Sequence, residues 1–308
     1  MSARVETMFY TRETPWHGLG TRVEEAPSSA DAIRLAGLDW HVNQKELLLD
    51  DGTRVPDCMA NVRAADGRVL GVVGSRYRVV QNADAFAFTD DLIGGDVKYE
   101  TAGSLNDGRR VWLLARLPTT ELAGDEVEPY VCFTNSHDGT GGVKVVMTPV
   151  RVVCSNTLNV ALSTAKRSWS MRHTESITDR LKEARNCLGL ANLYMRNLAA
   201  FADEAAHTPF GEEQVERMLD EVFPVYPHSP EKTVKNRKKC REEFYVCYFA
   251  PDLEKLRGTV WGVLNAMSDF ATHMPPLKQT ERYAENNFGR LLDGHPLIDK
   301  AAAIAMRG

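Results

Sequence analysis

The residues best suited to chemistry lie in one window of the chain, Val143–His173, which contains no aspartate or glutamate. The whole chain carries 37 basic and 42 acidic residues, a net charge of −5, so this window is positive against an acidic background. Lysine and arginine neutralise phosphate oxygens, and a local excess of them favours nucleic-acid or phosphate recognition. The five basic side chains of the window are Lys144, Arg151, Lys166, Arg167 and Arg172.

The end of this window adds an aromatic ring to the positive charge. The segment Lys166–His173 has the sequence KRSWSMRH, in which Trp169 lies between cations. Single-stranded nucleic acid is held by cations that bind phosphates and by flat rings on which bases stack. The pattern therefore predicts a single-stranded nucleic-acid site composed of Lys144, Arg151, Asn156, Lys166, Arg167, Trp169, Arg172 and His173.

A strand followed by a short helix is expected to position this site. Val143–Cys154 is rich in valine, as strands are, and Ser155 is a favourable N-cap for a helix over Asn156–Ala165. A helix N-terminus attracts anions, so Asn156 would add backbone amides to the site. Two simpler interpretations stay open: the charges are only solvated, and Trp169 is a core residue where sheet and helices meet.

A second basic run occupies Lys232–Arg241 and is a secondary candidate for the same chemistry. Runs of this kind are more often a solvated helix face than a binding surface. The residues retained as a secondary patch are Lys235, Arg237, Lys238, Lys239 and Arg241.

Catalytic and metal motifs are not found in the sequence. The eight histidines stand singly, the six cysteines form no CxxC pair, and neither HExxH nor Gly-x-Ser-x-Gly occurs. We therefore expect no enzymatic activity, no metal and no cofactor, and the chemistry that remains is binding.

The glycine-rich segment Ser136–Gly142 connects two predicted strands and lacks the Lys-Ser/Thr pair of a phosphate-binding P-loop. Within it, His137 and Asp138 form an adjacent imidazole–carboxylate pair. An aspartate that stabilises the turn explains this pair better than a catalytic dyad does.

Hydrophobic periodicity predicts an α+β fold: a twisted antiparallel β-sheet with helices packed on one face, followed by a helical C-terminal part. Turn residues separate the expected strands, which are Trp40–Leu49, Val55–Ala64, Val69–Val73, Val97–Leu105, Arg109–Leu117, Pro129–Thr134 and Val143–Val153. Apolar faces at helical spacing predict helices at Ser28–Ala36, Asn82–Ile93, Ile177–Ala206, Gly211–Val222, Gly258–His273, Thr280–Leu292 and Pro296–Met306.

Three regions follow from this order. We expect an irregular N-terminal arm with a short helix over residues 1–39, a β-rich core domain with the basic segment over 40–173, and a helical region over 174–308. The arm, which carries Trp16, and the edges of an antiparallel sheet both need cover, so a homo-oligomer is expected.

Composition places the chain among soluble globular proteins, with 43% hydrophobic and 26% charged residues. The sequence contains no apolar run near the ~20 residues that span a bilayer, and its N-terminus lacks the apolar region of a signal peptide. Unpaired cysteines favour a reducing compartment, so we expect a cytoplasmic protein without membrane partners. A sequence pI near 5.9 argues against coating of duplex DNA through bulk charge.

Several stretches of the chain resemble one family: WHGLG, SRYRVVQNADAF, ETAGSLNDGRRVWLLARLP, TPVRVVCSNTLNVAL and GTVWGVLNAMSDFATH. It is the phage/plasmid-like family of unknown function, found in bacteriophages, plasmids and mobile elements of bacteria. The resemblance covers nearly the whole chain in order and spacing. It implies a mobile-element protein that works in the cytoplasm of a bacterial host.

A remote similarity has been suggested between that family and the single-strand annealing recombinases, which form rings and hold single-stranded DNA in a basic groove. The resemblance implies a recombination protein that binds and anneals single-stranded DNA, or RNA, as a homo-oligomer or ring. The alternative is a phage-encoded protein-interaction module that inhibits a host defence or regulatory protein without binding nucleic acid.

Overall fold

The computed structural model describes residues 5–11, 21–24, 28–93, 98–151, 156–157, 168–174, 181–274 and 295–307. The chain forms two compact units, each assembled from separate segments. The first comprises Met1–Leu117, Tyr130–Met147 and Lys166–Ala191, and the second comprises Pro118–Pro129, Thr148–Ala165 and Asn192–Gly308.

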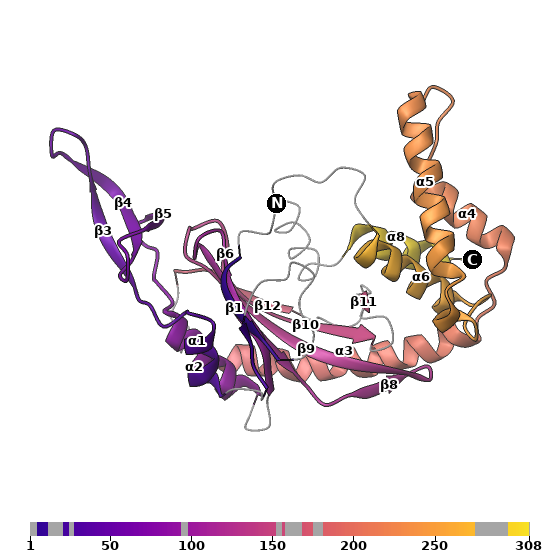
Figure 1. The fold of residues 1–308 in the computed structure, drawn as a ribbon, viewed down its shortest axis with the longest axis horizontal. Coiled ribbons are helices and arrows are strands. Elements are labelled where there is room, and N and C mark those ends of the chain that lie inside the picture. Colours follow the sequence, from indigo (N-terminus) through magenta and orange to yellow (C-terminus); the bar gives the residue numbers. More distant parts are fainter. Residues whose placement is uncertain are drawn as a thin grey trace. The chain divides into compact units, whose positions relative to one another are not determined.

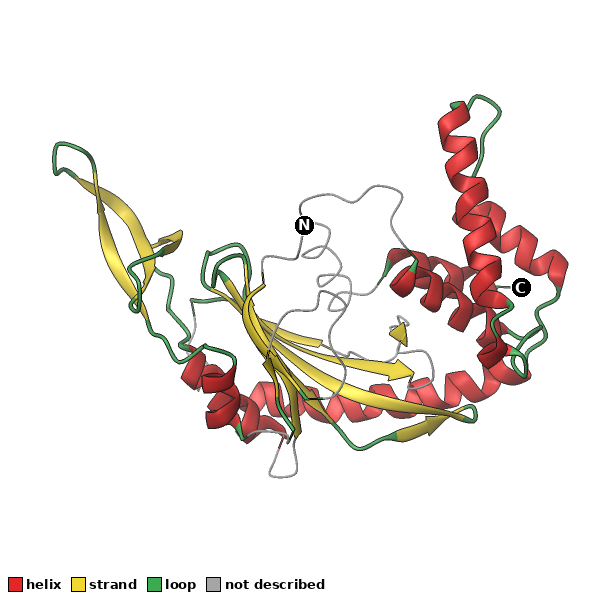
Figure 2. Ribbon diagram, viewed as in Figure 1, coloured by secondary structure: helices red, strands yellow, loops and turns green. Residues whose placement is uncertain are grey.

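A mostly antiparallel sheet is the largest β structure (Figures 1 and 2), and its strands follow the order β11–β10–β9–β7–β6–β1–β2. Two further strands join it, β12 beside β10 and β8 beside β9. The bounds are β1 Val5–Tyr10, β2 Thr21–Arg22, β6 Lys98–Leu105, β7 Arg110–Arg116, β8 Thr120–Leu122, β9 Asp125–Ser136, β10 Val143–Arg151, β11 Asn156–Thr157 and β12 Ser168–Met171.

The hairpin of β6 and β7 forms where its turn residues predict it. Asn106, Asp107 and Gly108 have φ angles of +54°, +61° and +85°, a left-handed conformation that these residue types tolerate. The two strands pair from Leu105–Arg110 at the turn to Lys98–Arg116. The predicted hairpin is therefore confirmed.

The N-terminal arm was expected to be irregular, and this prediction is wrong for Val5–Tyr10. These residues form β1, which pairs antiparallel with β6 and places Phe9 opposite Ala102. Met8 and Phe9 are buried, so β1 covers both an apolar face and what would otherwise be an open edge of β6. Trp16 and the glycines around it lie outside the described residues.

The helix predicted over Asn156–Ala165 is wrong for Asn156 and Thr157, the two residues of this range that the structure describes. Asn156–Thr157 forms β11, antiparallel to Val150–Arg151 at the end of β10. Hydrogen bonding to a neighbouring strand thus prevails over the local capping signal of Ser155.

A smaller sheet in the first unit has the order β3–β4–β5, with β3 Val42–Leu48, β4 Arg54–Arg63 and β5 Val69–Gly74. Two helices belong to the same unit, α1 Ser29–Leu35 and α2 Asn82–Ile93. The side chain of Ser28 accepts a hydrogen bond from the Asp31 backbone at 3.2 Å and caps α1. All five of these elements agree with the predicted ones.

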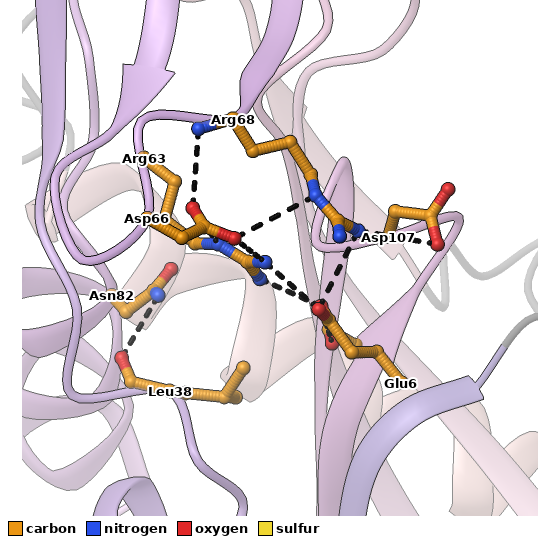
Figure 3. Close-up of polar contacts among 8 residues, drawn as sticks. Glu6, Leu38, Arg63, Asp66, Arg68, Asn82 and Asp107 are labelled. Atoms are coloured by element: carbon orange, nitrogen blue, oxygen red, sulfur yellow. Dashed lines mark hydrogen bonds and ion pairs between the residues drawn. The ribbon is translucent and has the colours of Figure 1, made fainter.

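An ion-pair network connects β1 to the small sheet (Figure 3). Arg63 donates to both carboxylate oxygens of Glu6, at 2.7 and 2.8 Å, and to Asp66 at 2.6 Å. Arg68 extends the network to Asp107, at 3.3 Å. Hydrogen bonding to Arg63 lowers the pKa of the Glu6 and Asp66 carboxyls, so both acids are ionised near neutral pH.

The second unit is mainly helical, and α6, Val260–His273, lies at its centre with nine successive buried residues from Val260 to Ser268. Trp261 of α6, Phe244 of α5 and Leu198 of α3 belong to one apolar core, to which the β8–β9 hairpin adds Leu122 and Val127. The helices are α3 Leu181–His207, which starts in the first unit, α4 Glu212–Val222, α5 Glu231–Tyr248, the short 3-10 helix η1 Pro251–Leu253, α6 and α8 Pro296–Ala305.

The architecture confirms the predicted α+β class, with an open antiparallel-rich sheet, helices and a helical C-terminal region. Among the described residues, no helix combines the length and the hydropathy that a bilayer crossing requires. The helix predicted at Thr280–Leu292 lies outside the described residues.

Candidate nucleic-acid interface

Trp169, the predicted base-stacking ring, is a core residue. It belongs to β12, where it lies opposite Val145 of β10, and 5% of its surface is exposed. The burial of β12 alternates, with Trp169 and Met171 buried and Ser168 and Ser170 exposed, as expected for a strand with one buried face. The stacking role predicted for Trp169 is therefore wrong.

The other predicted contacts are found in different settings. Lys144 is half-buried on β10, Arg172 is exposed directly after β12, and His173 is buried. Arg151 and Asn156 belong to the paired ends of β10 and β11. Lys166 and Arg167 lie outside the described residues.

Arg172 and His173 line a pocket of about 820 Å³ within the first unit. Three segments and one isolated residue form its walls: Gly74–Tyr77, Gly139–Gly142, Arg172–Thr174 and Asp57. The sheet topology thus brings together three chain segments that are distant in sequence.

The glycine-rich loop forms one wall and is held in shape by Asp138. One carboxylate oxygen of Asp138 accepts hydrogen bonds from the Ser136 hydroxyl at 2.5 Å, the Thr140 amide at 2.9 Å and the Thr140 hydroxyl at 2.7 Å. Burial raises the pKa of Asp138, but these hydrogen bonds outweigh it and leave the pKa lowered. Asp138 stabilises the turn, as predicted, and the loop has no P-loop geometry.

The same loop packs against the chain that follows β12, and the contact requires glycine. A Cβ atom at Gly142 would lie 2.2 Å from the carbonyl oxygen of Met171. No side chain fits at that distance, so Gly142 allows the loop and the Arg172–Thr174 segment to form one wall of the pocket.

Tyr77 and His173 stack within this wall, with ring centroids 4.4 Å apart and an angle of 16° between the rings. The Tyr77 hydroxyl donates to the Ser136 carbonyl at 2.7 Å, which ties the Gly74–Tyr77 segment to the glycine-rich loop. Burial raises the pKa of Tyr77, so its hydroxyl stays protonated.

His173 is neutral, because burial lowers its pKa. Its Nδ1 lies 3.1 Å from the Arg78 carbonyl oxygen, so Nδ1 carries the proton and Nε2 carries the lone pair. His173 was predicted to contact nucleic acid, but a buried, neutral imidazole contributes shape to the pocket and no charge.

A second buried imidazole, His137, lies in the glycine-rich loop. Asn82 donates through Nδ2 to the Leu38 carbonyl at 2.9 Å, so its Oδ1 accepts from His137 Nε2 at 3.0 Å. Burial, and to a smaller extent His173, lowers the pKa of His137 to about 3. The structure shows this polar core, whereas sequence reasoning treated Asn82 only as the start of a helix.

The exposed cations of the pocket are Arg76 and Arg172. Ser75, Thr140, Thr174 and one acid, Asp57, also belong to the lining, and the Thr140 hydroxyl already donates to Asp138. Guanidinium groups beside hydroxyl donors and glycine backbone are the groups that bind phosphate. Sequence reasoning missed Arg76 because it lies outside the acid-free window, although its neighbourhood, SRYR, holds two arginines between a strand and a helix.

The secondary basic patch lies on α5 in the second unit and is largely ion-paired. Arg241 bonds to Glu216 and Asp220, Lys239 lies 3.5 Å from Glu243, and Lys238 lies 3.9 Å from Glu242. Lys235 is exposed and Arg237 is half-buried. The pairing favours the interpretation of this run as a solvated helix face.

Metal binding has no support within the described residues, where no group of three or more histidine, cysteine, aspartate and glutamate side chains could hold an ion.

Comparison with curated proteins gave no match, and comparison with solved structures gave none either. A family model for a domain of unknown function, DUF932, matches residues 69–291, which include all of the pocket walls except Asp57. Since the match covers well over half of the chain, this protein belongs to the DUF932 family.

Proposed function

We propose that this chain binds single-stranded DNA and anneals complementary strands as a homo-oligomer, in recombination of a phage or mobile element in the bacterial cytoplasm. The observation that carries the proposal is the exposure of Arg76 and Arg172 on one glycine-lined pocket. The guanidinium groups of Arg76 and Arg172 can each bind two phosphate oxygens, and the hydroxyls of Ser75 and Thr174 can donate further hydrogen bonds.

Electrostatic capture of the backbone is the main source of affinity in this proposal, because Trp169 is buried and unavailable for stacking. Lys166 and Arg167 extend the acid-free window towards Arg172 in sequence and are proposed to add backbone contacts. A single strand is preferred to duplex because a local site on an acidic chain lacks the extended positive surface that a duplex would need.

Fluorescence anisotropy with labelled poly-dT and a matched duplex, measured across a salt series, tests the proposal. The double variant Arg76→Ala/Arg172→Ala should bind poly-dT more weakly and with a flatter salt dependence. Each lost phosphate contact reduces the log–log salt slope by ~0.7 for a single strand, so the slope should change by about 1.4.

Arg34→Ala is the matched control, since Arg34 is an exposed arginine of the same unit on α1, outside the pocket lining. It should leave both affinity and slope unchanged. The absence of single-strand binding at low salt, or an unchanged slope in the double variant, would reject the proposal. The variant Lys166→Ala/Arg167→Ala, measured in the same way, tests the rest of the window.

The second candidate is a protein-interaction module without nucleic-acid binding. Exposed Val69 and Val72 on β5 favour it, because apolar side chains on a sheet surface suit a protein partner. This candidate predicts that poly-dT fails to bind at any salt concentration and that the arginine variants behave as the wild type does.

A further inference from the structure

The hairpin of β3 and β4 is drawn in Figure 1, and two leucines at its turn are exposed to solvent. Leu48 is 60% exposed and Leu49 is 56% exposed, and the four residues before Leu47 on β3, Asn43–Glu46, are exposed as well. No other part of the described unit therefore covers this end of the hairpin. We call this end of the β3–β4 hairpin the arm tip and define it as Leu48, Leu49, Asp50 and Asp51; it is separate from the N-terminal arm.

The arm tip has a defined shape and a negative charge. Asp51 accepts a hydrogen bond from the Thr53 amide at 2.8 Å and thereby fixes the turn. Glu46 and Arg54 pair across the strands at 3.2 Å and neutralise each other. The turn segment, Leu47–Thr53, contains two aspartates and no basic residue, so the exposed leucines lie beside a net charge of −2.

The start of α5 combines exposed apolar side chains with basic residues, where the arm tip combines them with acidic ones. Tyr226 is 68% exposed, and Val225 and Val234 are exposed too. A turn closed by hydrogen bonds between Tyr226 and Ser229, at 2.9 Å, leads directly into the helix. Figure 1 shows this end of α5 extending beyond α4.

Basic residues outnumber acids along the first turns of α5, although Lys238 and Lys239 lie near Glu242 and Glu243. The segment Glu231–Lys239 contains five basic residues and one acid, a net charge of +4. Lys238 lies one helical turn after Val234 on the same helix face, 3.9 Å from Glu242, and Lys235 is exposed on the neighbouring face. We define the helix-start patch as Val225, Tyr226, Val234, Lys235 and Lys238.

We infer that the arm tip of one copy of this chain binds the helix-start patch of a second copy. The leucines would cover Tyr226 and Val234, and Asp50 would pair with Lys235 or Lys238. Both surfaces occur on every copy, so the contact is head-to-tail and builds a ring or a filament. This inference deepens the homo-oligomer of the proposed function and rests on it.

Light scattering on the purified chain without nucleic acid tests the contact. The wild type should exceed the 34.3 kDa of one chain at micromolar concentration. Leu48→Ser/Leu49→Ser and, separately, Tyr226→Ala/Val234→Ser should each reduce the mass to that of a monomer. Val246→Ser and Val72→Ser are matched controls, because both remove an exposed valine from α5 and β5 outside the two surfaces, and neither should change the mass.

Mixing and charge exchange make the test specific. An equimolar mixture of the two double variants should form a dimer, because one intact arm tip meets one intact helix-start patch. Asp50→Lys should weaken association at least tenfold, and Asp50→Lys combined with Lys235→Asp/Lys238→Asp should restore it.

The outcomes separate this contact from nucleic-acid binding. A monomeric wild type would overturn both the contact and the oligomer, whereas a wild-type oligomer that the variants leave intact would overturn the contact alone. Failure to bind poly-dT, with association and its loss as described, would reject DNA binding and leave the contact standing.

Discussion

Arg63 and Glu6 form a two-point ion pair that connects the N-terminal strand β1 to β4 of the small sheet, with N–O distances of 2.7 and 2.8 Å. The Arg63 side chain is 8% exposed, and its guanidinium carbon also lies 5.4 Å from the centre of the Trp40 ring. The pair explains how a short N-terminal segment, which sequence alone predicts to be irregular, is held in place.

Replacement of Arg63 by methionine should destabilise the first unit. The change leaves Glu6 and Asp66 without their main donor, and breaking a buried ion pair costs about 3–5 kcal/mol. Glu6 and Asp66 are partly exposed, so solvent screening should keep the loss of stability below that of a fully buried pair. Urea unfolding followed by tryptophan fluorescence measures the effect, with Arg34→Met, which breaks the exposed pair to Asp31, as control. A loss as small as the control's would contradict the structural role of the network.

Acidification should destabilise the fold through His137. The pKa of this group is near 6.5 in the unfolded chain and about 3 in the folded one. The unfolded state therefore binds more protons between these values, and the free energy of unfolding falls as pH drops below about 6.5. The slope from one such group reaches about 1.4 kcal/mol per pH unit.

His137→Gln removes the titration and retains an amide donor towards Asn82. His173, whose pKa burial also lowers, and Asp138 still titrate in this variant, so the comparison isolates His137. Unfolding measured from pH 7 to pH 4.5 should show a shallower pH dependence in the variant. Parallel curves for the two proteins would refute the neutral, buried state of His137.

Trp169→Ala should reduce stability rather than affinity. Truncation of a buried tryptophan costs about 3–5 kcal/mol, because the transfer and cavity terms add. Ser170→Ala on the exposed face of β12 is the control and should cost under ~0.5 kcal/mol. Poly-dT affinity per folded molecule should stay at the wild-type value, and a weaker affinity with unchanged stability would return Trp169 to a stacking role.

Gly142→Ala should disturb the pocket wall. The new methyl group would meet the Met171 carbonyl at 2.2 Å, and overpacking of this kind costs about 1–3 kcal/mol. Gly74→Ala, in the same pocket, is a suitable control, since the nearest neighbour of the new methyl group would be 4.0 Å away. Because the collision displaces Arg172, the Gly142 variant should also weaken poly-dT binding. Wild-type stability and binding in this variant would show that the loop has room to move.

Local sequence patterns were sufficient to predict the elements whose conformation depends on residues close together in the chain. The Asn106–Gly108 turn specifies the β6–β7 hairpin, because these residue types adopt positive φ at low cost. Thr259 caps α6 through a hydrogen bond from the Gly262 amide at 3.1 Å, and Asp138 holds its own turn. The hairpins, most helices and the α+β class follow from such short-range preferences.

The tertiary structure determined which strands pair with each other and which side chains come into contact. The segment around Trp169 forms a strand because β10 offers it an edge and an apolar face, and no local signal contains that information. The sequence by itself determined that positive charge gathers near Arg172. Only the fold placed Arg76, almost a hundred residues earlier, in the lining of the same pocket. Strand pairing brings distant segments together, and no local sequence pattern predicts which segments will meet.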